Sequence, residues 1–349
     1  MNQFSFEFDM PSPVEPVPSP SAPAVARARR TRPASPAALA PALTLEEMAQ
    51  RLEQSTDFRV LRRLVPVTDY GPPPAQAGQA SQGVRRVLVL DTETTGLSHQ
   101  ADKIIELAML LVDVDLASGL PFGPVTLFEG FEDPGMPIPA VAQQVTGISD
   151  DMVAGHRLDD AQVEALAARA DLIVAHNAGF DRPFMEARFP GFAAKAWACS
   201  FADIDWKAAG AESAKLSALA QNHGWFYDAH RAQVDCHALL QVLSRPMGPQ
   251  GPATGLNRLI SVAAQASFKL RATGSPFESK DLLKARGYRW DGDAKVWYCT
   301  LADQERLEVE LDWLKAEVYG RRQARVEIEA LDGLVRYSAR PGVVSQRGL

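Results

Sequence analysis

The chain has 349 residues, of which 46% are hydrophobic and 23% charged, as in ordinary globular proteins. Its formal net charge of −7 excludes a protein that binds nucleic acid by bulk positive charge alone, although a local basic cleft stays open. The three cysteines form no C-x-x-C pair, which argues against a disulfide framework and a cysteine zinc site. No apolar run is long enough to span a membrane, and the N-terminus lacks the charged-then-apolar order of a signal peptide, so we expect a cytoplasmic protein.

Residues 1–43 form a tail rich in proline, alanine and serine, which cannot bury enough apolar surface to fold, so it is predicted to be disordered. Within it, Gln3–Phe8 resembles the peptides that bind bacterial sliding clamps, with phenylalanine in place of the usual leucines. The alternative is a random apolar patch. The arginine-rich stretch Arg27–Arg32 is interpreted as solvated linker charge.

Residues 44–68 are predicted to form a short helical segment of one or two helices. Thr44 is a suitable N-cap, and Leu45, Met48 and Leu52 supply an apolar face. Residues 69–85 are rich in glycine, proline and small polar residues, and are predicted to be a linker.

Residues 86–245 carry the strongest hydrophobic patterning and are predicted to form an α/β domain, with a mixed central sheet flanked by helices. The expected strands are Arg86–Leu90, Ile104–Val114, Val125–Phe131 and Leu172–Ala175. The expected helices are Asp159–Ala170, Phe180–Arg188, Leu216–His223 and Arg231–Leu243.

A linker and short helix are predicted over 246–266, a small α+β accessory module over 267–338 and a C-terminal tail over 339–349. The expected elements of the module are Phe268–Ala272, Glu278–Arg286, Tyr288–Asp291, Val296–Leu301, Ala302–Val318 and Val326–Leu331. Basic and aromatic residues alternate here. They either contact nucleic acid or fill the core of the hairpin, and for Trp297 the core is favoured.

Two carboxylates follow the first predicted strand of the α/β domain. Asp91 and Glu93 are two residues apart, so on a strand they share one face. Like charges this close raise each other's pKa unless a cation lies between them, and hard divalent ions prefer oxygen ligands. The pair therefore indicates a metal site, or else a strand-to-turn junction whose side chains bond to the backbone.

Two further segments carry acidic residues near predicted helix starts. Asp181 follows His176-Asn177 and the strand Leu172–Ala175, where a carboxylate also serves as a helix N-terminal residue. His230 precedes Asp235 by five residues, so both reach one site only if His230 lies on the loop before the helix. A surface histidine is the alternative.

These segments, in this order, resemble the three motifs of the DEDDh 3′–5′ exonuclease family, most closely the proofreading epsilon subunits of bacterial DNA polymerase III. Asp91 and Glu93 match the first motif, Asp181 the second, and His230 with Asp235 the third. Gly147-Ile148-Ser149 resembles a further short family segment. The resemblance covers about 86–245 and implies a ribonuclease H-like fold.

The resemblance also implies the site. Asp91, Glu93, Asp181 and Asp235 would hold two Mg²⁺ or Mn²⁺ ions, and His230 would be the general base. The residues expected to contact substrate are Thr94, Thr95, Gly96, Leu97, Asn177 and Phe180. The arginines beside the motifs, Arg182 and Arg231, either contact phosphates or are solvated.

The function expected from the resemblance is 3′–5′ exonuclease action on single-stranded DNA in replication proofreading or repair, releasing nucleoside 5′-monophosphates. Two alternatives stay open. One is an exoribonuclease that turns over RNA or oligonucleotides, and the other is a catalytically silent nucleic-acid-binding module. Expected partners are the 3′ end of single-stranded DNA, a sliding clamp through Gln3–Phe8, or a replicative polymerase, but no membrane. The accessory module and the N-terminal region depart from the epsilon pattern, which makes a stand-alone repair nuclease as good an expectation as a replicative proofreader.

Overall fold

A computed structural model of the chain describes residues 43–74, 83–247 and 253–349. It divides the chain into two units, Met1–Ser55 and Thr56–Leu349. The predicted disordered tail, the clamp-like peptide Gln3–Phe8 and the arginine stretch Arg27–Arg32 all lie outside the described residues. In the described parts of the chain, no helix has the length and apolar character needed to cross a membrane.

The first unit contains helix α1 (Leu45–Glu53), whose start agrees with the sequence prediction. Thr44 and Glu47 form a capping box, in which the Glu47 backbone N–H donates to the Thr44 hydroxyl at 3.2 Å and the Thr44 backbone N–H donates to the Glu47 carboxylate at 2.8 Å. The rest of the predicted helical segment, up to residue 68, is not helical. It belongs to the second unit, where the short strand β1 (Arg62–Arg63) pairs with β7 (Trp225–Phe226) and Leu64 is buried.

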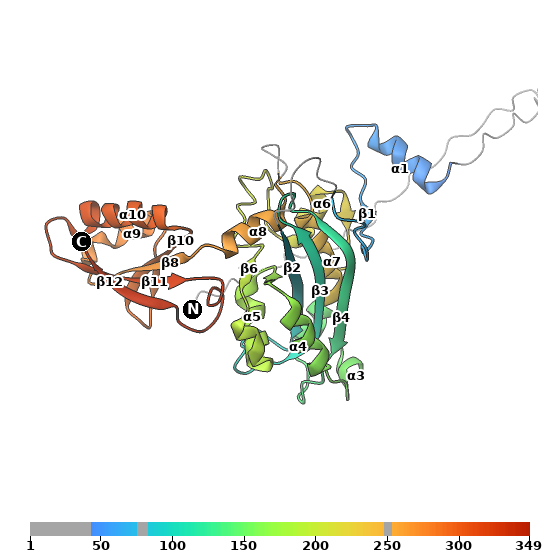
Figure 1. Cartoon of the computed structure of the whole chain (residues 1–349), viewed down its shortest axis with the longest axis horizontal. Helices are drawn as coiled ribbons and strands as arrows, with labels where there is room; N and C mark the ends of the chain where they lie inside the picture. The colour runs from blue at the N-terminus through green and yellow to red at the C-terminus, as the bar shows by residue number, and fades with distance from the viewer. Residues whose placement is uncertain (1–42, 75–82, 248–252) are drawn as a thin grey trace, which may run out of the picture. The chain divides into compact units, whose positions relative to one another are not determined.

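The main sheet of the second unit has the strand order β4-β3-β2-β5-β6 (Figure 1). Its strands are β2 (Val84–Thr94), β3 (Ile104–Asp115), β4 (Pro121–Phe131), β5 (Leu172–Ala175) and β6 (Trp197–Cys199). Strands β2, β3 and β4 pair antiparallel, whereas β5 pairs parallel to β2 and to β6. The predicted mixed sheet is therefore confirmed. Its central strands are apolar on both faces because helices cover both sides.

Alternate residues of β2 point to two separate hydrophobic cores. Val87 and Val89 contribute to a core that also holds residues of α6 (Leu216–Asn222), α7 (Ala232–Leu243) and α8 (Gly255–Ala263). Leu88 and Leu90 point to the opposite core, with residues of α4 (Asp160–Arg169) and α5 (Ala178–Arg188). This alternation fixes which face Asp91 and Glu93 occupy, since they continue the series of Val87 and Val89.

Several segments predicted as linkers or left without structure are ordered parts of this domain. The Tyr70 backbone N–H donates to the Gly123 carbonyl oxygen at 2.9 Å, so the predicted linker 69–85 is attached to the domain at its start. Within the predicted linker and helix 246–266, α8 contributes Leu256 and Leu259 to the core. The elements that were not predicted include α2 (Ala140–Thr146), α3 (Asp150–Val153) and β6 (Trp197–Cys199).

The accessory module is a five-stranded antiparallel sheet with the order β12-β11-β8-β10-β9. Its strands are β8 (Ser267–Ala272), β9 (Arg289–Asp291), β10 (Val296–Leu301), β11 (Arg325–Leu331) and β12 (Val343–Gly348), and its helices are α9 (Lys280–Ala285) and α10 (Gln304–Trp313). Side chains from β8, β11 and both helices form its core. The predicted C-terminal tail is wrong: β12 pairs with β11, which sequence patterning missed because every residue of β12 is exposed.

Between β11 and β12 the chain passes back over α5 and surrounds Arg182, which is fully buried. Its guanidinium donates to the carbonyl oxygens of Gly333 at 3.0 Å and Arg336 at 2.6 Å, and also to that of Leu334. The Arg182 Nε donates to Glu186 at 2.7 Å. We call this group the arginine junction. Both expectations for Arg182, a phosphate contact and a solvated side chain, are wrong, because the side chain is buried and each of its three nitrogens donates to a protein acceptor.

Candidate active site

Three carboxylates meet at the end of strand β2. Asp91, Glu93 and Asp235 each offer an oxygen, and these oxygens all lie within 4.8 Å of one another. Asp91 and Glu93 come from the same face of β2, as their spacing predicts, and Asp235 comes from the first turn of α7. Strand and helix are held together by the core beneath them, so the cluster rests on rigid elements.

Asp181 joins these three carboxylates from α5, and we call the four residues the carboxylate cluster. It is buried, and its Oδ1 accepts hydrogen bonds from the Thr92 backbone N–H at 3.1 Å and the Thr92 hydroxyl at 2.8 Å. These bonds bind the start of α5 to β2. Asp181 therefore serves as a contact between elements rather than as a cap of its own helix.

His230 reaches the same cleft through an unusual backbone. Its φ of 66° lies in the left-handed region, which turns the chain just before α7. The Asp235 Oδ2 accepts from the backbone N–H groups of His230 at 2.8 Å and Arg231 at 3.1 Å, and its Oδ1 accepts from the Tyr227 hydroxyl at 3.1 Å. Asp235 thus shapes the loop that presents the exposed His230 imidazole.

The carboxylate cluster and His230 line one cleft of about 640 Å³. Asn177 and Phe180, which the sequence predicted as substrate contacts, line it as well. Phe201 and Lys215 also line it, although nothing in the sequence singled them out. Phe201 is 48% exposed and packs edge-on against His176, so the cleft lining includes an apolar wall besides the acidic residues.

The acidic residues of the cleft raise one another's pKa. Burial raises the pKa of Asp91 well above its usual range, and the charges of Asp181, Asp235 and Glu93 raise it further. Burial, with Asp235 and Glu106 nearby, raises the pKa of Glu93 to about 8. The pKa values of Asp181 and Asp235 are also raised, mainly by burial, although hydrogen bonds from Thr92 and Tyr227 oppose the shift.

This electrostatic imbalance fits a divalent metal site. Oxygen atoms from three acidic residues lie within one coordination sphere's reach, and no sulfur or imidazole stands among them. A cation there would stabilise the ionised carboxylates, which burial and, at Asp91 and Glu93, neighbouring negative charges disfavour. This group holds three of the four predicted ligands, Asp91, Glu93 and Asp235, and does not include Asp181. That the four residues bind metal stays a prediction.

Glu106 is a residue of the site that the sequence analysis missed. It is buried on β3 directly opposite Glu93, and its carboxylate accepts from the Arg231 Nη2 at 2.9 Å and from the Ala232 backbone N–H at 3.0 Å. Glu106 therefore binds the start of α7 to the sheet. It also pairs with Arg231, for which a phosphate contact was one of the two expectations. The signal was present: a single glutamate interrupts the apolar strand Ile104–Asp115.

The hydroxyl groups of the turn after Glu93 donate hydrogen bonds to other residues of the chain. The Thr94 hydroxyl donates to the Gly96 carbonyl oxygen at 2.6 Å, and the Thr95 hydroxyl donates to Asp102 at 3.1 Å. A Cβ at Gly96 would lie 2.6 Å from the Asp102 carboxylate, so glycine is required for close packing and not for a positive φ. Leu97 is 87% exposed. The substrate contacts expected of these four residues stay predictions.

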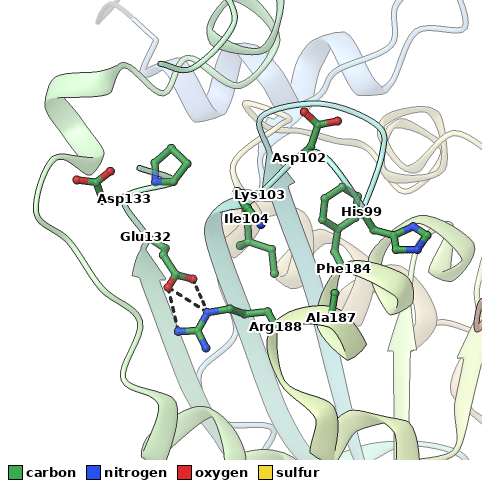
Figure 2. A pocket seen from close by; sticks show the side chains of 10 residues that line it. His99, Asp102, Lys103, Ile104, Glu132, Asp133, Phe184, Ala187 and Arg188 are labelled. Carbon is green, nitrogen blue, oxygen red and sulfur yellow. Dashed lines mark hydrogen bonds and ion pairs between the residues drawn. The ribbon is translucent and has the colours of Figure 1, made fainter. Parts of the chain in front are cut away.

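A second, smaller pocket of about 160 Å³ lies beside this turn and α5 (Figure 2). Figure 2 shows Arg188 reaching the Glu132 carboxylate, to which its Nη2 donates at 2.9 Å. Arg188 also pairs with Asp160 at 2.6 Å. His99 packs edge-on against Phe184 at the other side. The Arg188 guanidinium already pairs with two carboxylates, so it links α5 to α4 and to the residue after β4. It is therefore not a free cation for a ligand.

Residues 88–243 match the family model described as exonuclease (RNase_T). Over 103 residues the chain is 41% identical to the PolC-type DNA polymerase III of Listeria monocytogenes, a match that covers 29% of this chain and 7% of that protein. The corresponding enzyme of Bacillus subtilis is 37% identical over 109 residues, with the same coverage. The chain thus spans only a small part of the curated relatives it matches.

Two solved structures also match part of the chain. Exonuclease X in complex with 5′ overhanging duplex DNA is 24% identical, covers 45% of this chain and 89% of its own, and has a TM-score of 0.35. A full-length 3′-exonuclease is 14% identical, covers 48% of this chain and 62% of its own, and also has a TM-score of 0.35. The family match coincides with the domain that carries the acidic cleft. Over residues 88–243 the chain is similar to the exonuclease family model and, over 103 residues, to the PolC-type DNA polymerases III.

Proposed function

We propose that the chain removes nucleotides from the 3′ end of single-stranded DNA, releasing nucleoside 5′-monophosphates, and acts in replication proofreading or repair. The observation that carries the proposal is the cleft of the exonuclease domain, where the carboxylate cluster and His230 lie together. The two alternatives from the sequence, an exoribonuclease and a silent binding module, become outcomes of the test below.

Asp91, Glu93, Asp181 and Asp235 are the residues that would hold two Mg²⁺ or Mn²⁺ ions. When bound, such ions neutralise phosphate charge and make a water molecule a stronger nucleophile. The hydrogen bonds from Thr92 to Asp181 and from Tyr227 to Asp235 favour the ionised carboxylates, which metal binding requires. The chain's contribution is a prearranged, acceptor-rich site.

His230 is the proposed general base. It lines the cleft, its side chain is exposed, and a neutral imidazole has a nitrogen that can accept a proton. It would accept a proton from the water that attacks the last phosphodiester. The bond from phosphorus to the 3′ oxygen breaks, the terminal nucleotide leaves with its 5′ phosphate, and the shortened strand ends in a 3′ hydroxyl.

The apolar wall of the cleft suits the terminal base. Phe180 and Phe201 offer ring surfaces beside the carboxylates, and base-to-aromatic stacking tolerates any sequence. Asn177 and Lys215 add polar and cationic groups to the same lining. DNA is proposed as the substrate because the matched sequence relatives are PolC-type DNA polymerases III.

Two partners follow from the same proposal, and the peptide expected to bind one of them lies outside the described residues. A sliding clamp would bind through Gln3–Phe8, and a replicative polymerase would use the exonuclease as its proofreader. A stand-alone repair nuclease needs neither partner. Removal of residues 1–10 distinguishes these roles, because a clamp-dependent enzyme would lose clamp affinity while retaining nuclease activity.

The test is a gel assay on 5′-labelled single-stranded DNA and on RNA of the same sequence, with Mg²⁺ or with EDTA. We expect a metal-dependent ladder that shortens from the 3′ end, is faster on DNA and is absent in the Asp91→Ala variant. A faster ladder on RNA would overturn the DNA assignment. Absence of cleavage of both would overturn the catalytic proposal and leave a silent binding module, provided that circular dichroism shows a folded protein.

A further inference from the structure

The accessory module contains an open pocket of about 310 Å³ with an aromatic lining. Phe277, Trp290 and Trp297 contribute rings to it, and Lys280 and Lys295 contribute the charges. Trp290 and Trp297 lie opposite each other on β9 and β10, with ring centroids 5.5 Å apart at an angle of 60°. The hairpin therefore holds both indoles in fixed positions at the edge of the sheet.

Two of these rings are exposed and do not belong to the core of the module. Phe277 is 76% exposed and Trp290 is 52% exposed, whereas Tyr288 and Trp313 of the same module pack on each other within or beside its core. Single exposed apolar residues are common, but two large exposed rings around one pocket indicate a binding surface. Trp297 lines the pocket and also packs against the core of the module.

The charges at the pocket are positive. Lys280 and Lys295 are exposed, and none of the residues that line the pocket is acidic. The Lys280 ammonium lies 4.5 Å from the Phe277 ring centroid, which holds it at the rim. By contrast, Arg271 on the same sheet is occupied, with salt bridges of 2.8 Å to Glu327 and 2.7 Å to Glu329. The rim of the pocket is thus positively charged, whereas the charge of Arg271 nearby is neutralised by its two glutamates.

We infer that this pocket binds single-stranded nucleic acid, with a base stacked on the aromatic rings and flanking phosphates near Lys280 and Lys295. Aromatic faces with adjacent cations are the combination that non-specific single-strand binding uses. Nucleic acid, rather than an apolar peptide, is the chosen occupant because of the charge of the rim and because the chain carries a nuclease cleft, so that choice rests on the proposed function. The accessory module would then hold the strand while the cleft shortens it.

The first measurement is fluorescence anisotropy of a labelled oligothymidylate with the full chain in EDTA, which prevents cleavage. We expect Trp290→Ala to weaken binding about 5- to 100-fold, and Trp290→Phe, which keeps a ring, to restore most of it. Lys280→Gln should lower the slope of log Kd against log salt by about 0.7, as expected when one phosphate contact is lost. Lys315→Gln, an exposed lysine outside the pocket, is the matched control and should leave the slope unchanged.

A second assay separates this proposal from the proposed function. The p-nitrophenyl ester of thymidine 5′-monophosphate is too small to span two sites, so Trp290→Ala should cleave it at the wild-type rate while its KM for long DNA rises. Failure of the wild type to cleave either substrate would overturn the proposed function alone. Unchanged oligothymidylate binding by Trp290→Ala and Lys280→Gln would overturn the pocket proposal, whatever the nuclease activity, and would leave a protein partner as the better occupant.

Discussion

Two groups of buried charge lie close together in the chain and are built in opposite ways. The carboxylate cluster gathers acidic groups whose pKa values are raised by burial and, for Asp91 and Glu93, also by the neighbouring carboxylates. The arginine junction places one charge against carbonyl oxygens and Glu186, so that all of its groups are paired. Asp181 and Arg182, consecutive residues of α5, belong one to each group.

The difference separates a binding site from a structural contact. Buried like charges destabilise a metal-free protein, so they are explained by a ligand of opposite charge. A buried arginine with satisfied donors stabilises the arrangement of the chain around it, and its removal leaves acceptors without partners. Variants of the two groups should therefore affect activity and stability in opposite patterns.

The largest effect is expected on activity from His230→Asn. Loss of the general base should lower kcat about 10²- to 10⁴-fold. Asparagine tolerates the φ of 66° at this position, and the side chain is exposed, so the free energy of unfolding should change by less than about 0.5 kcal/mol. Steady-state kinetics on single-stranded DNA, with urea unfolding alongside, measure both. A variant that retains wild-type kcat would remove His230 from the mechanism.

The reverse pattern is expected from Arg182→Met, which keeps the length of the side chain but removes its charge and donors. The carbonyl oxygens of Gly333 and Arg336 lose their partner, so the free energy of unfolding should fall by about 3–5 kcal/mol. Arg169→Met on α4 is the matched control, an exposed arginine whose loss should change stability by less than about 0.5 kcal/mol. Equal urea midpoints for the two variants would show that the junction contributes nothing.

The carboxylate cluster should respond to pH and metal in a defined direction. In the folded protein the pKa of Glu93 is about 8, above its ordinary 4.5, so between these values the unfolded chain loses a proton that the folded chain keeps. This difference lowers stability as pH rises through that window. In EDTA, the melting temperature of wild type relative to Glu93→Gln should therefore fall between about pH 5.5 and about pH 8.

Addition of Mg²⁺ supplies the other arm of that experiment. Because metal binding requires ionised carboxylates, Mg²⁺ should raise the wild-type melting temperature more at the higher pH. The Glu93→Gln variant should respond less at both. A wild type whose melting temperature runs parallel to that of Glu93→Gln at every pH, with and without Mg²⁺, would show that Glu93 neither carries the raised pKa nor binds metal.

The sequence predicts features that depend on residues close together in the chain and misses features that depend on distant ones. The shared face of Asp91 and Glu93 follows from their spacing on one strand, and His230 was placed correctly once the start of α7 was recognised. The arginine junction was not predictable in the same way. Arg182 and its acceptor on Gly333 are 151 residues apart, and the interaction is to backbone atoms, which leave no signature in side-chain patterning.

The same limit explains the errors in the accessory module and the missed cleft residues. Strand β12 has no buried residue to create a periodic pattern, since its pairing with β11 uses the backbone. Phe201 lies on a loop after β6 and reaches the cleft only through the fold. Glu106 is a different case, because an acidic residue in an apolar strand is itself a signal in the sequence. Such a residue predicts a buried polar contact, which the sequence analysis missed.

The smallest effect is expected from Tyr227→Phe, which removes the hydroxyl that donates to Asp235 at 3.1 Å. That hydrogen bond favours the ionised form of Asp235, so its loss should raise the Mg²⁺ concentration for half-maximal activity about 10-fold. At saturating Mg²⁺ the kcat should stay near the wild-type value, because Tyr227 acts on the ligand and not on the substrate. Tyr298→Phe, in the accessory module, is the control for loss of a phenolic hydroxyl. If both variants show the wild-type metal dependence, Asp235 does not depend on this bond and is oriented by the backbone N–H groups of His230 and Arg231.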